Sequence, residues 1–304
     1  MPLLAFLSMD NLHGFVSDDE LAVEPLKKYG WTVKTVSWRQ PCDWSRFDMV
    51  IIRSTWDYQN HNGEFLQALE KIAASGAQLQ NDLELVKWNF RKTYLRELQE
   101  KGNRIVPTLW ENEGIYAERL HYYFEELQTE EIIIKPVISA NADDTFRLKK
   151  EEVASRSGVL NQIFSKRPFM VQPFMGKIIE EGEYSLFYFG GEYSHAILKT
   201  PKKNDFRVQE EHGGVITPVI ANDELRVSGT FTLGSIQQTP LYARVDFVRD
   251  AENKFAVMEV ELIEPALYFR MDHPYAAKRF AYAVSNWAGS KMNKKVNEMV
   301  EGEE

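Results

Sequence analysis

Two segments late in the chain alternate between apolar and charged residues, and this pattern constrains the fold more than any other. In Phe255–Ile263 the charged positions are Glu259 and Glu261, and in the segment before it they are Arg244 and Asp246. Because the side chains of a strand alternate between its two faces, each charged pair lies on one face. A short loop joins the segments, which predicts an antiparallel hairpin with Asp246 opposite Glu259. The same register places Arg244 opposite Glu261.

The carboxylates of this hairpin predict a site for a cation. Two carboxylates that face each other across a sheet repel unless a cation lies between them. Clusters of acidic oxygen ligands suit Mg²⁺, which takes one or two carboxylates and leaves positions for substrate phosphates. The alternative is a solvated polar face on which Arg244 is the counter-ion. Apolar neighbours at both ends of each strand favour interior strands, and therefore the metal site.

The first hundred residues alternate between strands and helices. Strands are expected at Leu3–Ser8, Trp31–Trp38, Met49–Arg53 and Ala77–Gln80, with helices at Asp18–Tyr29, Gly63–Ala74 and Leu83–Glu100. This order predicts a parallel α/β domain over residues 1–83.

The rest of the chain, residues 84–304, groups its strands and helices differently and predicts an α+β unit. Its strands are expected at Ile105–Thr108, Glu131–Pro136, Phe169–Gln172, Tyr184–Phe189, Glu192–Lys199, Leu241–Arg249 and Phe255–Ile263. Its helices are expected near Ile115–Leu127, Glu151–Ser165, Asn222–Ser235 and Pro274–Trp287.

Charge and cysteine content argue against several classes of protein. Lys and Arg total 36 and Asp and Glu total 45, so the net charge of −9 would repel a polyanion, and nucleic acid is not the expected main partner. Cys42 is the sole cysteine, which excludes an intrachain disulfide and a cysteine-rich metal site. No apolar run approaches the ~18 residues of a membrane span. We therefore expect a cytoplasmic protein without a membrane partner.

Two lysines interrupt apolar patterns. Lys92 falls in the apolar stripe of the helix expected at Leu83–Glu100. The alternative to a functional role is a lysine that extends outward from a partly buried face. Lys135 ends the apolar run Ile132–Ile134, which puts a cation at the mouth of a buried strand. The polar loop Ser139–Thr145 could let backbone N–H groups approach a phosphate, and an ordinary polar turn explains it equally well.

A basic loop, Lys199–Gln209, lies between these lysines and the acidic hairpin. Such a loop could close over an anionic substrate, with Arg207 binding a phosphoryl or carboxylate oxygen through two N–H groups. A solvated charged loop is the alternative.

Together these residues resemble the ATP-grasp superfamily, in particular its glutathione-synthetase-like branch. The motifs that resemble this superfamily lie within roughly Leu83–Pro265. The residues before them resemble it only in the expected order of strands and helices. Within that branch the chain is similar to the cyclo-ligase family of cycloserine biosynthesis, which closes O-ureido-D-serine into a ring at the expense of ATP. The motifs that carry this likeness are Ile52–Tyr58, Trp88-Asn89 with Lys92, Asp205–Gln209 and Glu261–Pro265.

The resemblance implies a two-subdomain ATP-grasp fold, with a lid subdomain at roughly residues 104–172, and a role for each motif residue. The ATP-binding residues would be Lys92, Lys135, Gln172, Pro173, Phe174 and Glu183. Mg²⁺, with Mn²⁺ as the alternative, would be held by Asp246, Glu259 and Glu261. The phosphoryl transfer would be served by Lys199, Arg207 and Arg244. The loop Ser139–Thr145 departs from the family because it lacks glycine.

The function implied by the resemblance is ATP-dependent ligation of a carboxylate to an amine through an acyl phosphate, either between two molecules or within one. The partners would be small-molecule carboxylates and amines, and a homodimer is expected only by analogy. One alternative is an ATP-grasp kinase that phosphorylates a small molecule. The other is a nucleotide-binding module without turnover.

The segment Arg53–Tyr58 predicts the substrate site, because it follows a buried strand and open α/β sheets bind ligands at the carboxyl ends of their strands. The expected roles are carboxylate binding by Arg53, orientation by Ser54 and Thr55, a pocket wall at Trp56 and Tyr58 and amine pairing by Asp57. The alternative is that the aromatic residues cap the core while Arg53 and Asp57 pair with each other.

Overall fold

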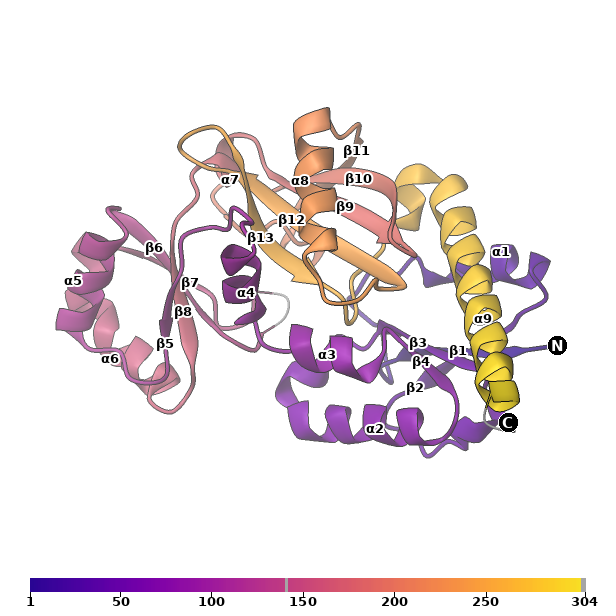
Figure 1. Ribbon diagram of the computed structural model, residues 1–304. Coiled ribbons are helices and arrows are strands. Elements are labelled where there is room, and N and C mark those ends of the chain that lie inside the picture. Colours follow the sequence, from indigo (N-terminus) through magenta and orange to yellow (C-terminus); the bar gives the residue numbers. More distant parts are fainter. Residues whose placement is uncertain (140–141, 302–304) are drawn as a thin grey trace.

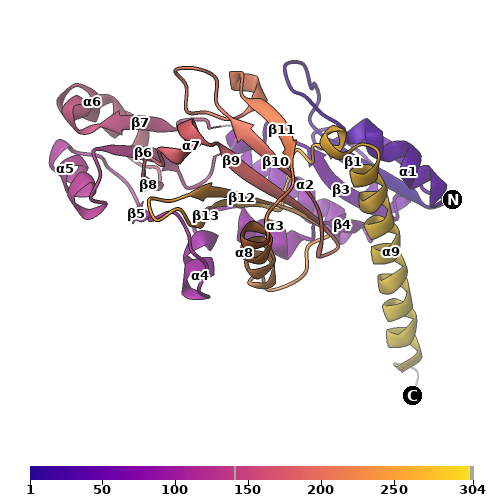
Figure 2. The ribbon, with the colours of Figure 1, turned by 90° about the horizontal axis from the view of Figure 1, so that it is seen from above.

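The computed structural model describes residues 1–139 and 142–301. Three sheets organise these residues: one near the N-terminus, one in the centre and one in the part of the chain that was predicted as the lid, here called the lid subdomain (Figure 1). The lid subdomain and the long C-terminal helix lie at opposite ends of the molecule, as Figure 2 shows from above. The mixture of one parallel and two antiparallel sheets confirms the predicted fold class.

The N-terminal sheet is parallel, with strand order β2-β1-β3-β4. Its elements are β1 (Leu3–Ser8), α1 (Val23–Lys28), β2 (Thr32–Ser37), β3 (Met49–Ser54), α2 (Asn62–Ala74) and β4 (Gln78–Gln80). The central strands β1 and β3 are almost entirely buried, which is typical of parallel strands covered on both faces. One face packs against α9 and the central sheet, and the other packs against α2.

The lid subdomain is an antiparallel sheet, β5-β8-β6-β7, covered by two helices. Its elements are β5 (Leu109–Glu111), α5 (Ala117–Glu126), β6 (Glu131–Pro136), β7 (Phe146–Lys149), α6 (Val153–Phe164) and β8 (Phe169–Pro173). The apolar residues of α5 and α6 form a separate core with one face of β6 and β8. The strand β7 was not predicted, and the predicted strand Ile105–Thr108 is replaced by β5 and an isolated bridge at Ile105.

The central sheet is antiparallel, with strand order β11-β10-β9-β12-β13. Its elements are α7 (Lys177–Glu180), β9 (Glu183–Phe189), β10 (Glu192–Thr200), β11 (Val215–Val219), α8 (Asp223–Gly234), β12 (Tyr242–Arg249), β13 (Phe255–Glu261) and α9 (Tyr275–Glu301). The helix α8 covers the apolar face of this sheet, so the charged positions of β12 and β13 lie on the opposite face.

The predicted register of the acidic hairpin is confirmed. Asp246 pairs with Glu259 and Arg244 pairs with Glu261. The register then shifts at a bulge between Asp246 and Phe247, which returns the apolar residues of both strands to the core.

The single helix predicted at Leu83–Glu100 is wrong, because the structure has two helices, α3 (Leu83–Asn89) and α4 (Tyr94–Glu100). In the break between them the Lys92 amide donates to the Val137 carbonyl at 2.9 Å. This bond links the break to the end of β6 and replaces an intrahelical bond. The apolar periodicity continues across the break, since Leu85, Leu95 and Leu98 still face one core.

Buried side chains hold the backbone that follows β13, here called the exit segment, residues 262–265. Each of its four carbonyls accepts a hydrogen bond from a side chain distant in sequence. The donors are Asn81 Nδ2 to Leu262 (2.7 Å), Tyr242 Oη to Ile263 (2.9 Å), Trp56 Nε1 to Glu264 (2.9 Å) and Arg53 Nη2 to Pro265 (2.9 Å). The N-terminal domain thus fixes the position of the chain directly after the acidic strand.

We expect replacement of Tyr242 by phenylalanine to destabilise the fold by about 1–3 kcal/mol, the usual cost of leaving buried polar groups without a partner. The Tyr242 hydroxyl is fully buried and lies 2.9–3.1 Å from the carbonyl oxygens of Ile52, Gln80 and Ile263. Chemical denaturation measures the change. The matched control is Tyr282→Phe, at an exposed tyrosine, and equal stability of the two variants would contradict the expectation.

A second stability prediction concerns His195, which is buried and stacked on Phe187. Burial, with the nearby Arg279 cation, lowers the pKa of His195 to about 4 from an ordinary value of 6.5. A lowered histidine pKa gives stability that is complete above pH 6.5 and is lost as the pH falls from 6.5 toward 4. We expect a loss of about 2–3 kcal/mol over this window, at roughly 1.4 kcal/mol per pKa unit.

Denaturation curves from pH 7 to pH 4 on the wild type and His195→Gln measure this contribution. The glutamine variant should show a flatter dependence of stability on pH. Parallel curves for the two proteins would show that His195 does not contribute to acid sensitivity.

Candidate functional site

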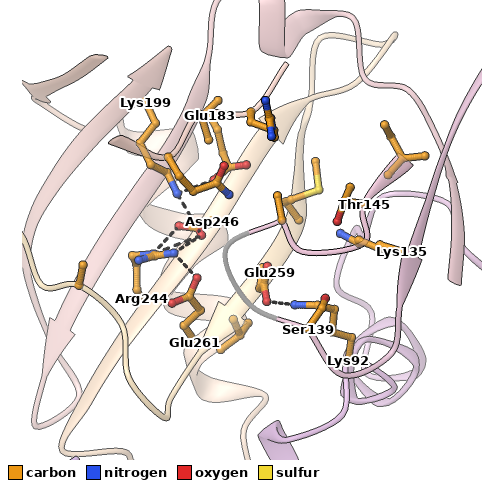
Figure 3. Close-up of a pocket in the computed structure, with 18 of the residues that line it drawn as sticks. Lys92, Lys135, Ser139, Thr145, Glu183, Lys199, Arg244, Asp246, Glu259 and Glu261 are labelled. Carbon is orange, nitrogen blue, oxygen red and sulfur yellow. Dashed lines mark hydrogen bonds and ion pairs between the residues drawn. The ribbon is translucent and has the colours of Figure 1, made fainter. Parts of the chain in front are cut away.

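A cavity lies where the charged face of the central sheet meets the lid sheet and the N-terminal domain (Figure 3). The central sheet contributes Glu183, Lys199, Arg244, Asp246, Glu259 and Glu261. The lid subdomain and its hinge contribute Lys135, Ser139, Thr145, Gln172, Pro173 and Phe174. The N-terminal domain contributes Trp56 and Tyr58, and the helix break contributes Lys92.

Asp246 lies at the centre of the charged face and is almost completely buried. Its carboxylate accepts hydrogen bonds from Arg244 at 3.0–3.2 Å, from Lys199 at 3.2 Å and from the Ser185 hydroxyl at 2.6 Å. Burial opposes the negative charge, yet the two cations lower the pKa of Asp246 to about 2. Asp246 is therefore an anion throughout the physiological range.

Glu259 and Glu261 also contact cations. Glu259 forms an ion pair with Lys92, and Glu261 forms one with Arg244 (Figure 3). Burial raises the pKa of Glu261 to about 7, and the negative charges of Asp246 and Glu259 add to this effect against the attraction of Arg244. The neighbouring cations therefore do not fully compensate the negative charge of the three carboxylates, and a further cation would stabilise their ionised form.

The oxygen atoms of these three carboxylates are suitable ligands for a divalent cation, but the three groups do not form a complete coordination site. Among residues 1–139 and 142–301, no three acidic, histidine or cysteine side chains converge closely enough to hold an ion unaided. Mg²⁺ commonly takes one or two carboxylates and completes its shell with waters and phosphate oxygens, so a partial donor set of this kind suits it. Magnesium binding by Asp246, Glu259 and Glu261 stays a prediction.

Lys135, a predicted nucleotide lysine, and Lys199, predicted to serve the phosphoryl transfer, lie on opposite walls of the cavity (Figure 3). Lys199 is buried and contacts Glu183 at 2.5 Å as well as Asp246. Lys135 projects from β6 into the cavity and has no ion-pair partner within the described part of the chain (Figure 3). Burial and the nearby Lys92 lower the pKa of Lys135 to about 8. An unpaired cation in such a place needs an external anion.

The predicted hinge residues line the cavity at the end of β8, where Gln172 and Pro173 are its last residues and Phe174 follows them. Gln172 is buried and donates to the Thr108 hydroxyl at 2.9 Å. The Phe174 ring lies 3.7 Å from the Arg147 guanidinium and packs edge-on against Phe206. The predicted ribose ligand Glu183 lies beside this aromatic wall and is paired with Lys199.

The two predicted phosphate loops contribute to the cavity to different degrees. Arg207 lines it from the basic loop and is held by Asp205 through contacts of 2.8 and 3.1 Å. Of the glycine-free loop, Ser139 and Thr145 line the cavity, whereas residues 140–141 lie outside the described residues.

The predicted substrate residues divide into two groups. Trp56 lines the cavity, but Arg53, Ser54, Thr55 and Asp57 do not. Arg53 is 1% exposed and binds Asp19 at 3.0 Å and the exit segment, while Asp57 pairs with Arg39. The alternative pairing of Arg53 with Asp57 is therefore wrong, and Arg53 is placed to position the exit segment.

Tyr58, predicted with Trp56 as a wall of the substrate pocket, lines the cavity, and so do Glu264 and Tyr268, which were not assigned a role from sequence. The sequence does single out Glu264. It is a further acidic residue close behind Glu259 and Glu261, and it lies outside their alternating pattern. Tyr268 has a left-handed backbone (φ 47°), which sequence gave no reason to expect.

Comparisons with known proteins agree with this architecture. A family model described as the N-terminal domain of D-cycloserine synthetase DcsG matches residues 4–81. The cycloserine biosynthesis protein DcsG of Streptomyces lavendulae is 28% identical, over 86% of this chain and 91% of that protein.

Solved structures show the same fold. The crystal structure of D-cycloserine synthetase DcsG superposes with a TM-score of 0.82 at 24% identity, over 94% of this chain and 99% of that one. A RimK-domain ATP-grasp protein from Sphaerobacter thermophilus superposes with a TM-score of 0.69 at 11% identity, covering 93% of this chain and 99% of the other. The ATP-grasp ligase PsnB, complexed with a minimal precursor, gives 0.63 at 17% identity, covering 93% and 98%.

These solved structures show that the chain has the fold of the ATP-grasp ligases. Among these proteins it is similar to the cycloserine synthetase DcsG, in the N-terminal domain by the family model and over most of its length by sequence. No helix in the described part of the chain is both long and apolar enough to cross a membrane.

Proposed function

We propose that this chain joins a carboxylate to an amine through an acyl phosphate, with Mg-ATP converted to ADP and phosphate. The observation that carries the proposal is the unpaired Lys135 opposite a wall of carboxylates in one cavity. Such a cavity can bind a polyanionic nucleotide on one side and present metal-binding oxygens on the other. The cytoplasmic location, the domain boundary near residue 83 and the lid at residues 104–172 belong to the same proposal.

The chemistry requires activation of the acid. A carboxylate is a poor electrophile, and Mg-ATP, when bound, supplies the phosphoryl group and the charge compensation that turn it into an acyl phosphate. An amine then attacks the acyl carbon and phosphate leaves. The chain itself must orient the two reactants, neutralise developing charge and keep water away.

The residues divide these tasks by position. Lys135 and Lys92 would contact nucleotide phosphates, and the hinge residues 172–174 would contact the base. Lys199 and Arg244 would neutralise the oxygens of the transferring group, because both cations already lie against Asp246. Arg207 would approach from the basic loop, and the lid sheet would exclude water.

A screen for ATP turnover tests the proposal. Wild-type protein with Mg-ATP is assayed for phosphate release against amino acids and dipeptides, with O-ureido-D-serine included because the relative DcsG is a cycloserine biosynthesis protein. Parallel reactions contain hydroxylamine, which traps an acyl phosphate as a hydroxamate. We expect acid-dependent hydroxamate with at least one compound.

Product analysis separates the alternatives. Phosphate retained on the product would identify a kinase. ATP binding without phosphate release or hydroxamate over the whole panel would identify a binding module and overturn the ligase proposal.

A further inference from the structure

Four carboxylates that line the cavity have cationic partners. Lys199 pairs with Glu183 and with Asp246, which also binds Arg244. Lys92 pairs with Glu259, and Arg244 pairs with Glu261. Each of these four carboxylates therefore has at least one cationic partner within the protein.

Glu264 differs from these carboxylates. It lines the same cavity and is half-buried, yet it has no ion-pair partner within the described residues. Its side chain is hydrogen-bonded to the Tyr58 hydroxyl. Burial raises the pKa of Glu264 to about 8, and the negative charge of Glu261 acts in the same direction. This carboxylate lacks a counter-ion in the protein, and a cationic ligand could supply one.

The exit segment fixes where this carboxylate lies. The Glu264 carbonyl accepts from Trp56 Nε1 and the Pro265 carbonyl accepts from Arg53 Nη2, both at 2.9 Å. Arg53 is itself held by Asp19 at 3.0 Å. The backbone on both sides of the Glu264 side chain is therefore immobilised by buried donors, which pre-organises the carboxylate for binding.

Aromatic rings stand beside this carboxylate. Trp56 and Tyr58 both line the cavity, and Phe15 packs against Trp56 with ring centroids 5.4 Å apart. Aromatic faces attract ammonium groups and do not attract anions. A half-buried carboxylate and aromatic side chains in one cavity have the composition of a site for an organic cation.

We propose that Glu264 binds an ammonium group of the substrate and selects amino-acid-like substrates over acids that lack an amino group. This inference rests on the proposed ligase function and extends it to the substrate end of the cavity. Glu264 is a specificity residue in this account, and Arg53 and Trp56 are its positioning residues. The substitution Glu264→Gln keeps the size and the bond to Tyr58 but removes the charge.

Calorimetric titration tests the assignment without turnover. Protein saturated with Mg²⁺ and the non-hydrolysable analogue AMP-PNP is titrated with O-ureido-D-serine, D-serine, L-serine and 3-hydroxypropanoate, which is serine without its amino group. We expect wild type to bind at least one amino acid about tenfold or more tightly than 3-hydroxypropanoate. Glu264→Gln should lose this preference while its affinity for AMP-PNP is unchanged.

A matched control is Glu126→Gln, which removes one exposed carboxylate from α5, far from the cavity lining. Its preference for the amino group should equal that of wild type. Tyr58→Phe should weaken the preference in part, because Glu264 loses its hydrogen bond. The proposal is overturned if Glu264→Gln keeps the preference, or if wild type has none.

Failure of the ligase proposal gives a different result. Wild type that prefers the amino group but forms no hydroxamate with any acid would contradict ligation and leave the ammonium site in place. Hydroxamate formation without any preference for the amino group would contradict the ammonium site alone.

Discussion

Replacement of Glu259 by glutamine is expected to lower turnover by at least about a hundredfold, the usual cost of removing one preorganised charge from a reacting centre. Glu259 faces Asp246 across the acidic hairpin and is paired with Lys92. Glutamine keeps the shape but removes the charge that would balance a divalent cation. Phosphate release at saturating and at limiting Mg²⁺ measures the effect.

The protein should stay folded in this variant, because the Glu259 side chain is 26% exposed and the glutamine amide oxygen can still accept a hydrogen bond from the buried Lys92. Asp246→Asn is a less clean test, since it would leave two buried cations, Arg244 and Lys199, without their shared partner. The control is Glu252→Gln, at an exposed residue of the loop that joins the same two strands. Near wild-type turnover of Glu259→Gln at limiting Mg²⁺ would refute the metal assignment.

Replacement of Lys135 by methionine is expected to weaken ATP binding about tenfold or more, while thermal stability stays the same or rises. A charged group that is buried without a counter-ion costs folding energy and is retained where function needs it. Lys135 has this character, because its pKa is lowered to about 8 by burial and by Lys92. Calorimetry with Mg-ATP gives the affinity, and thermal unfolding gives the stability.

The matched control is Lys166→Met, which removes an exposed lysine of the same subdomain. Its ATP affinity should equal that of wild type. Unchanged nucleotide affinity in Lys135→Met would show that Lys135 does not contact phosphate and that its side chain merely extends from a partly buried strand.

The strand register of the acidic hairpin was predictable from the sequence pattern alone. Strict alternation and a short connecting loop are sufficient to predict the pairing of Asp246 with Glu259 that the structure has. Both signals are local, since they depend on a strand period of two residues and on the geometry of a short turn. The parallel N-terminal sheet was predictable for a similar reason, because its buried strands are short apolar runs separated by helices.

Features that depend on distant contacts were not predictable. The helix break at Lys92 is stabilised by the Val137 carbonyl, and nothing in the local periodicity signals that bond. The partners of Arg53 were not predictable for the same reason, because Asp19 and Pro265 are remote from it in sequence.

The most direct test of the central claim uses a substrate identified in the screen, with its carboxylate labelled with ¹⁸O. An acyl phosphate transfers one carboxylate oxygen to phosphorus, so the account predicts that the released phosphate carries one ¹⁸O atom per turnover. Released phosphate without label, or phosphate that stays bonded to the product, would contradict activation of the acid as an acyl phosphate.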